Sequence, residues 1–439
     1  MWQRVKLILC SPVFIVSFAF LVRMIFLYWD WKTAPAAVRA FQPYGYELGR
    51  VARAIASGQG FSSPLRMVDS GPTAWFTPIF PYLVAGIFKI WGVYSDLSRI
   101  IIQTMNSAFT ALTIIPIYCI GRKSFGQAVA VSASWFWVFM PTALVFPRIW
   151  IWDTAMAGLF FALLFWGTLA LAEYQSTWAW AGYGGLWAIG VLVNPSMLSV
   201  FPFLLGWVLW ETRQDGAPWI KFATATLLVF ALGMVPWTVR NYRVFGKVIV
   251  LRSNLGLELW LGNNPAVPDS WSPWTHPNDD AEEARKYQRM GEIPYMAEKQ
   301  RLAIEFMRTH PADTVRFIFH RFVDNWIAVS DSPLDSWSYS PLYVKLFMVL
   351  NISLSLFTLL GALFAYRAKH PNALPYAIVL LIFPLIFYLT HASLRYRFPM
   401  DPIMMVLSAY GIGQMIAAVS GRLSSPSRAA APTRPLPIS

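Results

Sequence analysis

Charged side chains are scarce in this sequence. They make up 13% of the 439 residues, whereas hydrophobic residues make up 56%. A soluble protein typically carries about twice that charged fraction. So few charges could not cover a surface in water, which excludes a soluble globular protein, a disordered chain and a coiled coil. The composition predicts a multi-pass membrane protein.

Cysteine is also scarce, and acidic residues are outnumbered. The two cysteines, Cys10 and Cys119, each lie at or inside an apolar segment and cannot form a disulfide framework. Lysine and arginine total 35 against 22 acidic residues, for a net charge of +13. Because the basic residues lie mostly between apolar runs, they indicate membrane orientation, and we expect no nucleic-acid partner.

Ten apolar segments predict transmembrane helices, so the expected fold class is an all-α polytopic membrane protein. These segments are residues 7–27, 97–120, 127–146, 153–172, 178–193, 197–211, 220–238, 341–366, 374–391 and 399–419. Several are short and contain glycine or proline, which neighbouring helices in a bundle can accommodate.

Residues 77–94 are also apolar enough to span, and the distribution of charge decides between two topologies. If this segment lies in the membrane interface, the short loops fall on two consistent sides, one of which is strongly basic. The cations on that side are Arg4, Lys6, Arg122, Lys123, Arg213, Lys221, Arg367, Lys369, Arg422, Arg428 and Arg434, against the acids Glu173, Glu211 and Asp215. The positive-inside rule then puts both termini in the cytoplasm. If residues 77–94 span the membrane instead, everything downstream inverts.

The interfacial topology divides the chain into four parts. These are a membrane module at 1–238 with a first periplasmic loop at 28–96, a periplasmic loop region at 239–340 with interfacial helices, C-terminal transmembrane helices at 341–420, and a disordered cytoplasmic tail at 421–439. In the first loop, YGYELGRVARAIAS has an apolar stripe of helical period. In the second, VIVLRSN and LGLELWLGNN predict short strands, and three helices follow them.

The central thirds of the predicted spans contain essentially no ionisable residues. The unexplained polar residues collect at the outer membrane boundary, and they are Glu47, Asp153 with Arg148, Arg240 with Asn241, and the run from His391 to Arg397. Ionisable residues at unusual depth are where function is best sought in a membrane protein.

Each of two acids at this boundary has two interpretations. Asp153 is either the N-cap of a helix or a carboxylate that faces a boundary cavity. Glu47 is either a solvated acid paired with Arg50 or a general base held at the lipid surface.

The stretch HASLRYRFPMDP predicts an anion site. Pro399 disfavours helical geometry at Phe398, so RYRF is expected to be extended, and a helix then begins near Pro399. Free backbone N–H groups and the guanidinium groups of Arg395 and Arg397 would bind a lipid phosphate. The alternative is anchoring of the two arginines to anionic headgroups. Arg240 is a weaker candidate for substrate binding.

A metal site has little support in the sequence. Acidic residues and a histidine gather at 276–283, but Asp280 is better explained as a helix cap. No cofactor is certain, and a divalent metal stays open.

Several stretches together resemble the GT-C glycosyltransferases of the family-39 type, which includes protein mannosyltransferases and the aminoarabinose transferase of lipid A. The stretches are ARAIASGQGF, PIFPYLVAGIFKIWG, NSAFTALTIIPIYCIGRKSFG, Asp153, VPWTVRNYRVFG, LWLGNNP and RYRFPMDP. Each is weak alone, and their order and spacing make the group fairly specific. The resemblance implies a GT-C-like bundle, a polyprenyl-phosphate sugar donor, a periplasmic site and usually inversion at the anomeric carbon.

The resemblance also implies roles for individual residues. The first-loop catalytic acid of the family falls near Tyr44, so its role passes to Glu47, the nearest acid, and Asp153 matches the second acid. Arg395 and Arg397 match the late basic motif in type.

The sequence therefore predicts a glycosyltransferase of a bacterial inner membrane. It would move a sugar from a polyprenyl-phosphate donor to an unknown glycan, lipid or protein acceptor, with Glu47 and Asp153 catalytic and Arg395, Arg397, Arg240 and His391 binding substrate. A lipid-linked glycan flippase or other transporter, and a non-catalytic polyprenyl-phosphate-binding subunit, are the alternatives.

Overall fold

The computed structural model describes residues 7–33, 46–149, 151–269, 272, 275–327 and 342–421. Within these ranges every regular element is a helix, and the one isolated β-bridge joins Ser62 to Pro72. The all-α prediction is confirmed. The tail predicted to be disordered lies outside the described residues beyond position 421.

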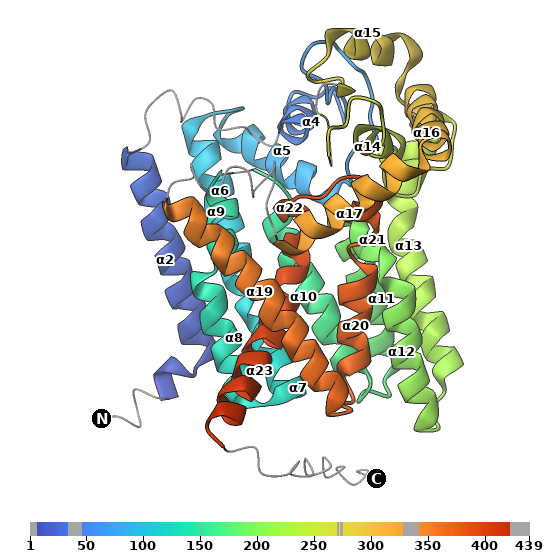
Figure 1. Ribbon diagram of the computed structural model, residues 1–439. Helices are drawn as coiled ribbons and strands as arrows, with labels where there is room; N and C mark the ends of the chain where they lie inside the picture. The colour runs from blue at the N-terminus through green and yellow to red at the C-terminus, as the bar shows by residue number, and fades with distance from the viewer. Residues whose placement is uncertain are drawn as a thin grey trace.

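Long apolar helices form an upright bundle (Figure 1). Six stretches of the described residues are long and apolar enough to cross a membrane. They are α2 (Pro12–Thr33), α6 (Asp96–Leu112) with α7 (Ile114–Phe125), α10 (Thr154–Leu171), α13 (Trp219–Phe245), most of α19 (Leu342–Arg367), and α22 (Leu394–Arg397) with η3 (Phe398–Met400) and α23 (Asp401–Val419). A pair bent by 45°, α8 (Gln127–Phe139) and α9 (Pro141–Ile149), makes a seventh. The chain is a multi-pass membrane protein.

Shorter helices complete the same bundle. They are α11 (Thr177–Val193), η1 (Pro195–Ser199) with α12 (Phe201–Gln214), and α20 (Ala373–Ile382) with α21 (Leu385–Leu389). Each of the ten apolar segments of the sequence therefore coincides with a helix or a helix pair of the bundle, although the long apolar helices alone account for six or seven crossings.

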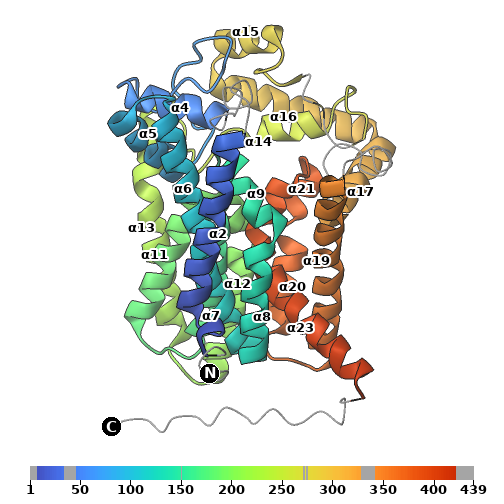
Figure 2. The same ribbon diagram turned by 90° about the vertical axis from the view of Figure 1, so that its left-hand side faces the viewer.

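A helical cap covers one end of the bundle (Figures 1 and 2). Its helices are α4 (Glu47–Ala56), α5 (Ile79–Trp91), α14 (Leu255–Gly262), α15 (Ala281–Met290), α16 (Glu292–Thr309) and α17 (Pro311–Ile327). The buried carboxylate of Glu292 accepts hydrogen bonds from the backbone N–H of Ala74 at 2.7 Å and from the hydroxyls of Ser253 and Tyr287 at 2.6 Å. This carboxylate therefore joins the two outer loops into one body.

Residues 77–94 do not cross the bundle. Helix α5 has 13 residues, about 20 Å of helix, whereas a bilayer core is about 30 Å thick. The chain also leaves and re-enters at the same end, because Trp31 near the end of α2 donates to Gln103 of α6 at 3.3 Å. Arg99 of α6 stacks over the same indole at 4.6 Å. Helix α5 is therefore too short for a full crossing and lies at the cap end of the bundle, which is compatible with the interfacial interpretation of this segment.

The opposite end of the bundle joins the predicted short loops. Lys123 in the last turn of α7 forms an ion pair of 2.7 Å with Glu173, which follows α10. Ser124 accepts a hydrogen bond of 3.1 Å from Tyr376 of α20. Helix α2 begins and helix α23 ends at this same end in Figure 1.

Small residues allow the helices of the bundle to approach closely. A Cβ added to Gly361 of α19 would lie 2.0 Å from the carbonyl oxygen of Leu407 in α23. Only glycine fits such an approach, which is the usual basis of tight helix packing in membranes.

Three local predictions are wrong. The segment LGLELWLG is helix α14 and not a strand, because Leu257 and Leu261 bury one helical face in the cap; so short an apolar run is ambiguous in the sequence. RYRF is helical and not extended, because Ser393 caps α22 and accepts from the N–H of Arg395. The predicted end of the first span, at residue 27, is also wrong, because α2 runs to Thr33. Arg23 therefore lies in the middle of this helix, where it is fully buried and its Nε donates to Thr110 at 2.9 Å.

Candidate functional site

A ring of polar and aromatic side chains forms where the cap meets the bundle. Its nine members, which we call the boundary ring, are Tyr46, Glu47, Trp152, Asp153, Glu258, His276, His391, Arg395 and Tyr396. Four elements supply most of them: the start of α4, the start of α10, helix α14 and helix α22. The fold therefore brings together two acids and an arginine that are up to 348 positions apart in the chain, Glu47, Asp153 and Arg395.

Glu47 is held inside the cap and is not a solvated acid. Only 14% of its side chain is exposed, and His276 Nε2 lies 4.0 Å from its Oε1. The same oxygen accepts a hydrogen bond from the side-chain amide of Asn278. Arg50, the partner that the sequence suggested, instead donates its Nε to the carbonyl of Pro64 at 2.8 Å.

Asp153 precedes α10, yet its side chain caps no backbone N–H of that helix. Its Oδ2 accepts a hydrogen bond of 3.1 Å from Asn194. Burial raises the pKa of this carboxyl, whereas Arg252, Arg395 and the Asn194 hydrogen bond oppose the shift. The carboxylate is thus held by Asn194 and does not cap the helix, and its raised pKa makes it a stronger base than a free aspartate.

Glu258 and His391 form a second, partly buried contact in the boundary ring. His391 Nδ1 lies 3.3 Å from Glu258 Oε2. Burial, with Arg395 and Arg321 nearby, lowers the pKa of His391 to about 3. At neutral pH the imidazole is uncharged, so this contact is not an ion pair. Burial also raises the pKa of Glu258, although Arg252 and His276 lower it.

Arg395 lies between aromatic rings on the bundle side of the boundary ring. Its guanidinium stacks on Trp152 at 3.8 Å and on Tyr396 at 4.7 Å. One terminal nitrogen donates to the hydroxyl of Tyr396 at 2.7 Å. Stacking of this kind fixes the plane of the guanidinium group and leaves its edge to bind anions.

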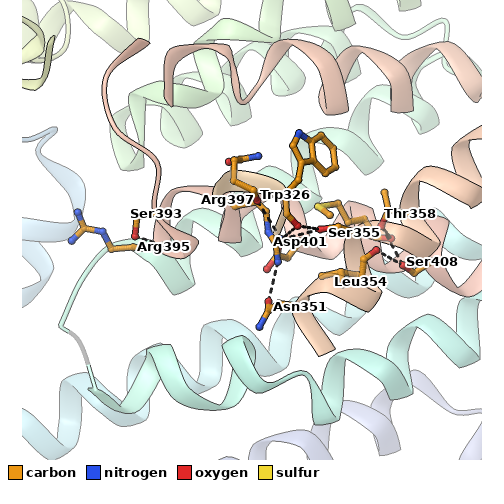
Figure 3. Close-up of polar contacts among 12 residues, drawn as sticks. Trp326, Asn351, Leu354, Ser355, Thr358, Ser393, Arg395, Arg397, Asp401 and Ser408 are labelled. Carbon is orange, nitrogen blue, oxygen red and sulfur yellow. Dashed lines mark hydrogen bonds and ion pairs between the residues drawn. The ribbon is translucent and has the colours of Figure 1, made fainter. Parts of the chain in front are cut away.

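Arg397 points away from Arg395 and into the bundle (Figure 3). It is fully buried and forms an ion pair of 2.9 Å with Asp401, one helical turn later. It also donates to Asn351 at 2.9 Å and to Ser355 at 3.1 Å. The sequence groups Arg397 with Arg395, but the structure gives the two arginines different surroundings.

Arg240 fastens the cap to α13. Its terminal nitrogens donate to the carbonyls of Thr73 at 2.6 Å and Phe61 at 2.7 Å, and its face stacks on Trp237 at 5.0 Å. These hydrogen bonds are made with the protein backbone and not within the boundary ring.

Sequence reasoning missed Glu258, Asn194 and Arg252, and it considered His276 only as a possible metal ligand. Glu258 is an isolated acid in the apolar run LGLELWLG, and Arg252 is an isolated cation in VIVLRSN. Isolated charges in apolar runs were a usable signal for both. Asn194 and His276 carry no such signal, because only the folded chain brings them to the acids.

The acids of the ring do not form a metal centre in the described part of the chain. No group of three or more His, Cys, Asp or Glu side chains there is arranged to hold a metal ion. Asp280 caps α15 and accepts from the N–H groups of Glu282 and Glu283 at 2.7 and 3.1 Å. The capping interpretation of this acidic segment is confirmed.

Two surface grooves lie elsewhere. One of about 670 Å³ follows the outer face of α16, and one of about 340 Å³ follows α13. Neither includes a member of the boundary ring, so the ring is defined by its contacts and not by either groove.

The bundle, the cap and the charged ring between them define a membrane protein with a GT-C-like fold. The apo crystal structure of the Archaeoglobus fulgidus oligosaccharyltransferase is similar over 94% of this chain and 52% of that chain, with 14% identity and a TM-score of 0.55. The same organism's oligosaccharyltransferase AglB, in complex with an inhibitory peptide and a dolichol-phosphate, gives a TM-score of 0.50 at 14% identity, over 94% of this chain and 52% of that chain. The chain spans about half the length of these structures, and identity this low shows the fold alone.

One stretch of the sequence matches a known protein family. Residues 73–237 match the family described as dolichyl-phosphate-mannose-protein mannosyltransferase, and this match confirms the resemblance that the motifs predicted. No curated protein sequence matches the chain.

Proposed function

We propose that this protein is a membrane glycosyltransferase that takes a sugar from a polyprenyl-phosphate donor and attaches it to an acceptor outside the cytoplasm. One observation carries the proposal: Glu47, Asp153 and Arg395, predicted separately, meet in the boundary ring. The match of residues 73–237 to a dolichyl-phosphate-mannose-dependent family supports this donor class.

In the proposed reaction Glu47 takes the proton of the acceptor nucleophile, and Asp153 orients the acceptor. The nucleophile bonds to the anomeric carbon as the carbon–oxygen bond to phosphate breaks, and the electron pair leaves with the phosphate oxygen. Arg395 stabilises that charge. A single displacement of this kind inverts the anomeric centre. Substrate roles for Arg240, Arg397 and His391 have less support, since the hydrogen bonds of the two arginines are made with the protein.

The finer assignments belong to the same proposal. The chain would cross a bacterial inner membrane about ten times, with α11, α12 and α20–α21 as additional short crossings. The cap, formed by the loop regions 28–96 and 239–340, would be periplasmic, and both termini would be cytoplasmic. The basic short loops at the opposite end, where Lys123 meets Glu173, support this orientation.

The test is incubation of the purified chain with a panel of polyprenyl-phosphate sugars, with donor loss followed by mass spectrometry. Glu47→Gln and Asp153→Asn keep the size of the side chain and one acceptor oxygen but remove the charge, and each should lower the rate about 10²- to 10⁴-fold. The matched control is Glu305→Gln, whose carboxylate is 62% exposed and pairs only with Arg301 among described residues. Wild-type rates in both ring variants would remove the catalytic assignment.

The binding-subunit alternative makes a different prediction. A non-catalytic protein would bind undecaprenyl phosphate but would leave every sugar-loaded donor intact. The transporter alternative calls for a polar path through the bilayer centre. Arg23 is a fully buried arginine in the middle of a long apolar helix, but its three guanidinium nitrogens are already bonded to Thr110 and to backbone carbonyls. Enzymatic transfer is therefore the better-supported function.

A further inference from the structure

Arg252 lies beside the boundary ring and is anchored by only part of its guanidinium group. Its Nε donates to the carbonyl of Trp75 at 2.7 Å. Its guanidinium carbon lies 5.4 Å from the ring centre of Phe76. These contacts fix the side chain through one nitrogen and one face. No hydrogen bond to a described residue uses its two terminal nitrogens.

Arg395 is also anchored by only part of its guanidinium group. Two aromatic rings stack on its guanidinium group, and the Tyr396 hydroxyl accepts a hydrogen bond from one of its terminal nitrogens. Both arginines therefore present N–H groups that the fold has positioned and that no described residue accepts in a hydrogen bond. Such preorganised donors suit an anion with several oxygens.

The two arginines share neighbours. Each is close enough to act electrostatically on the carboxyls of Asp153 and Glu258 and on the hydroxyl of Tyr396. The backbone explains this proximity, since Arg252 leads into α14, and Glu258 of α14 contacts His391, four residues before Arg395. Arg397, by contrast, is bound to Asp401.

Neither arginine forms an ion pair within 4.0 Å with a described carboxylate, although acids are near both of them. Partly buried cations without a contacting anion are costly. A bound anion between them would remove that cost.

We propose that Arg252 and Arg395 together form the site for the phosphate group of the donor, in place of the pair Arg395 and Arg397 that the sequence suggests. This inference rests on the proposed function. A polyprenyl-phosphate sugar is a phosphodiester with one negative charge, and cleavage of the sugar–oxygen bond leaves a monoester with up to two. The second arginine therefore acts more strongly on the departing phosphate than on the bound donor.

The first experiment measures binding of undecaprenyl phosphate to the full chain in nanodiscs. Arg252→Gln and Arg395→Gln should each weaken binding about 10- to 100-fold. Arg252→Lys, which keeps the charge but not the planar fork, should give an intermediate loss. The matched control is Arg301→Gln, whose side chain is 65% exposed and pairs with Glu305; it should bind like the wild type.

Two further probes identify the ligand. Undecaprenol lacks the phosphate, so Arg252→Gln should not change its binding; an equal loss for undecaprenol would show a structural defect and overturn the proposal. Inorganic phosphate should compete only at far higher concentration, and competition at equal concentration would assign the site to free phosphate instead of the lipid.

Kinetics separate this inference from the proposed function. With an active wild type, Arg252→Gln should lower kcat more than it raises KM, because the arginine acts chiefly on the departing group. Wild-type kcat and wild-type lipid affinity in this variant would overturn the inference and leave the glycosyltransferase intact. If the wild type consumes no donor, but Arg252→Gln still weakens the binding of undecaprenyl phosphate, the proposed function fails and the phosphate site stands.

Discussion

Asp153 shows how a buried carboxylate can reduce stability. Burial raises its pKa, so the folded state binds a proton more readily than the unfolded state does. The contribution of this group to stability therefore falls as pH rises from the ordinary pKa of an aspartate through the raised value. At neutral pH the charged form is the destabilising one.

Asp153→Asn should therefore be more stable than the wild type at pH 7.5 while losing transfer. An asparagine oxygen can still accept from Asn194, and the gain should be roughly 0.5–2 kcal/mol, as in other exchanges of activity for stability. Thermal unfolding in nanodiscs, followed by tryptophan fluorescence, measures the change. A lower unfolding temperature would mean that the carboxylate is structural.

His391 gives the opposite pH dependence. Its pKa is lowered to about 3 by burial, so the unfolded chain binds the proton more readily than the folded chain. The contribution of His391 is complete above pH 6.5 and is lost as pH falls from there toward 3. His391→Asn should therefore unfold at temperatures that fall less steeply between pH 6.5 and pH 4 than those of the wild type.

The control for this measurement is a histidine outside the boundary ring. His320→Asn, on α17, should keep the wild-type slope. Identical slopes for His391→Asn and the wild type would contradict the neutral, buried state of His391.

Charge patterning recovered part of the site from the sequence, and packing supplied the rest. Asp153, His391 and Arg395 were recognisable because each is a polar residue near the end of an apolar run, and Glu47 because it borders the apolar stripe of a predicted first-loop helix. Glu258 joins them because α14 lies against the segment before α22, where a Cβ on Gly262 would be 1.7 Å from the carbonyl oxygen of Thr390. No local pattern encodes that approach.

Among the helices, α14 and α22 show why local rules failed where they did. Both are short, at eight and four residues, so periodicity has little to act on. The ion pair from Arg397 to Asp401 spans one helical turn and stabilises helix across Pro399, against the preference of the proline. The long spans had no such competition and were all recognised as helices, although α2 and α13 extend six and seven residues beyond their predicted ends.

This ion pair predicts that Arg397 is structural. Arg397→Met leaves Asp401 buried without its partner and should cost about 3–5 kcal/mol of stability. The double variant Arg397→Met, Asp401→Leu replaces the pair with apolar side chains and should recover most of that loss. Thermal unfolding of Arg397→Met, Asp401→Leu and the double variant completes the double-mutant cycle.

Undecaprenyl phosphate binding provides the second readout. The double variant should bind the lipid like the wild type. A folded double variant that has lost lipid binding would restore Arg397 to the substrate site that the sequence suggested.

The whole molecule has a charge asymmetry that follows the bundle axis. The cap end carries the boundary ring, and the opposite end carries the basic short loops with the Lys123–Glu173 pair. Since Trp31 of α2 contacts Gln103 of α6 at the cap end, the order of crossings is fixed from the first helix onward. One measured position on each side therefore sets the orientation of the entire chain.

Single cysteines can make that measurement on the full-length protein. With Cys10 and Cys119 replaced by serine, Asp96→Cys and Asp279→Cys lie at the cap end, where the native side chains are 77% and 50% exposed. Glu173→Cys lies at the other end, where the native side chain is 72% exposed. A membrane-impermeant maleimide should label the first two in intact spheroplasts and the third only after lysis. Labelling of Glu173→Cys alone would invert the orientation and put the boundary ring in the cytoplasm, whereas labels on opposite sides for Asp96→Cys and Asp279→Cys would contradict a single cap.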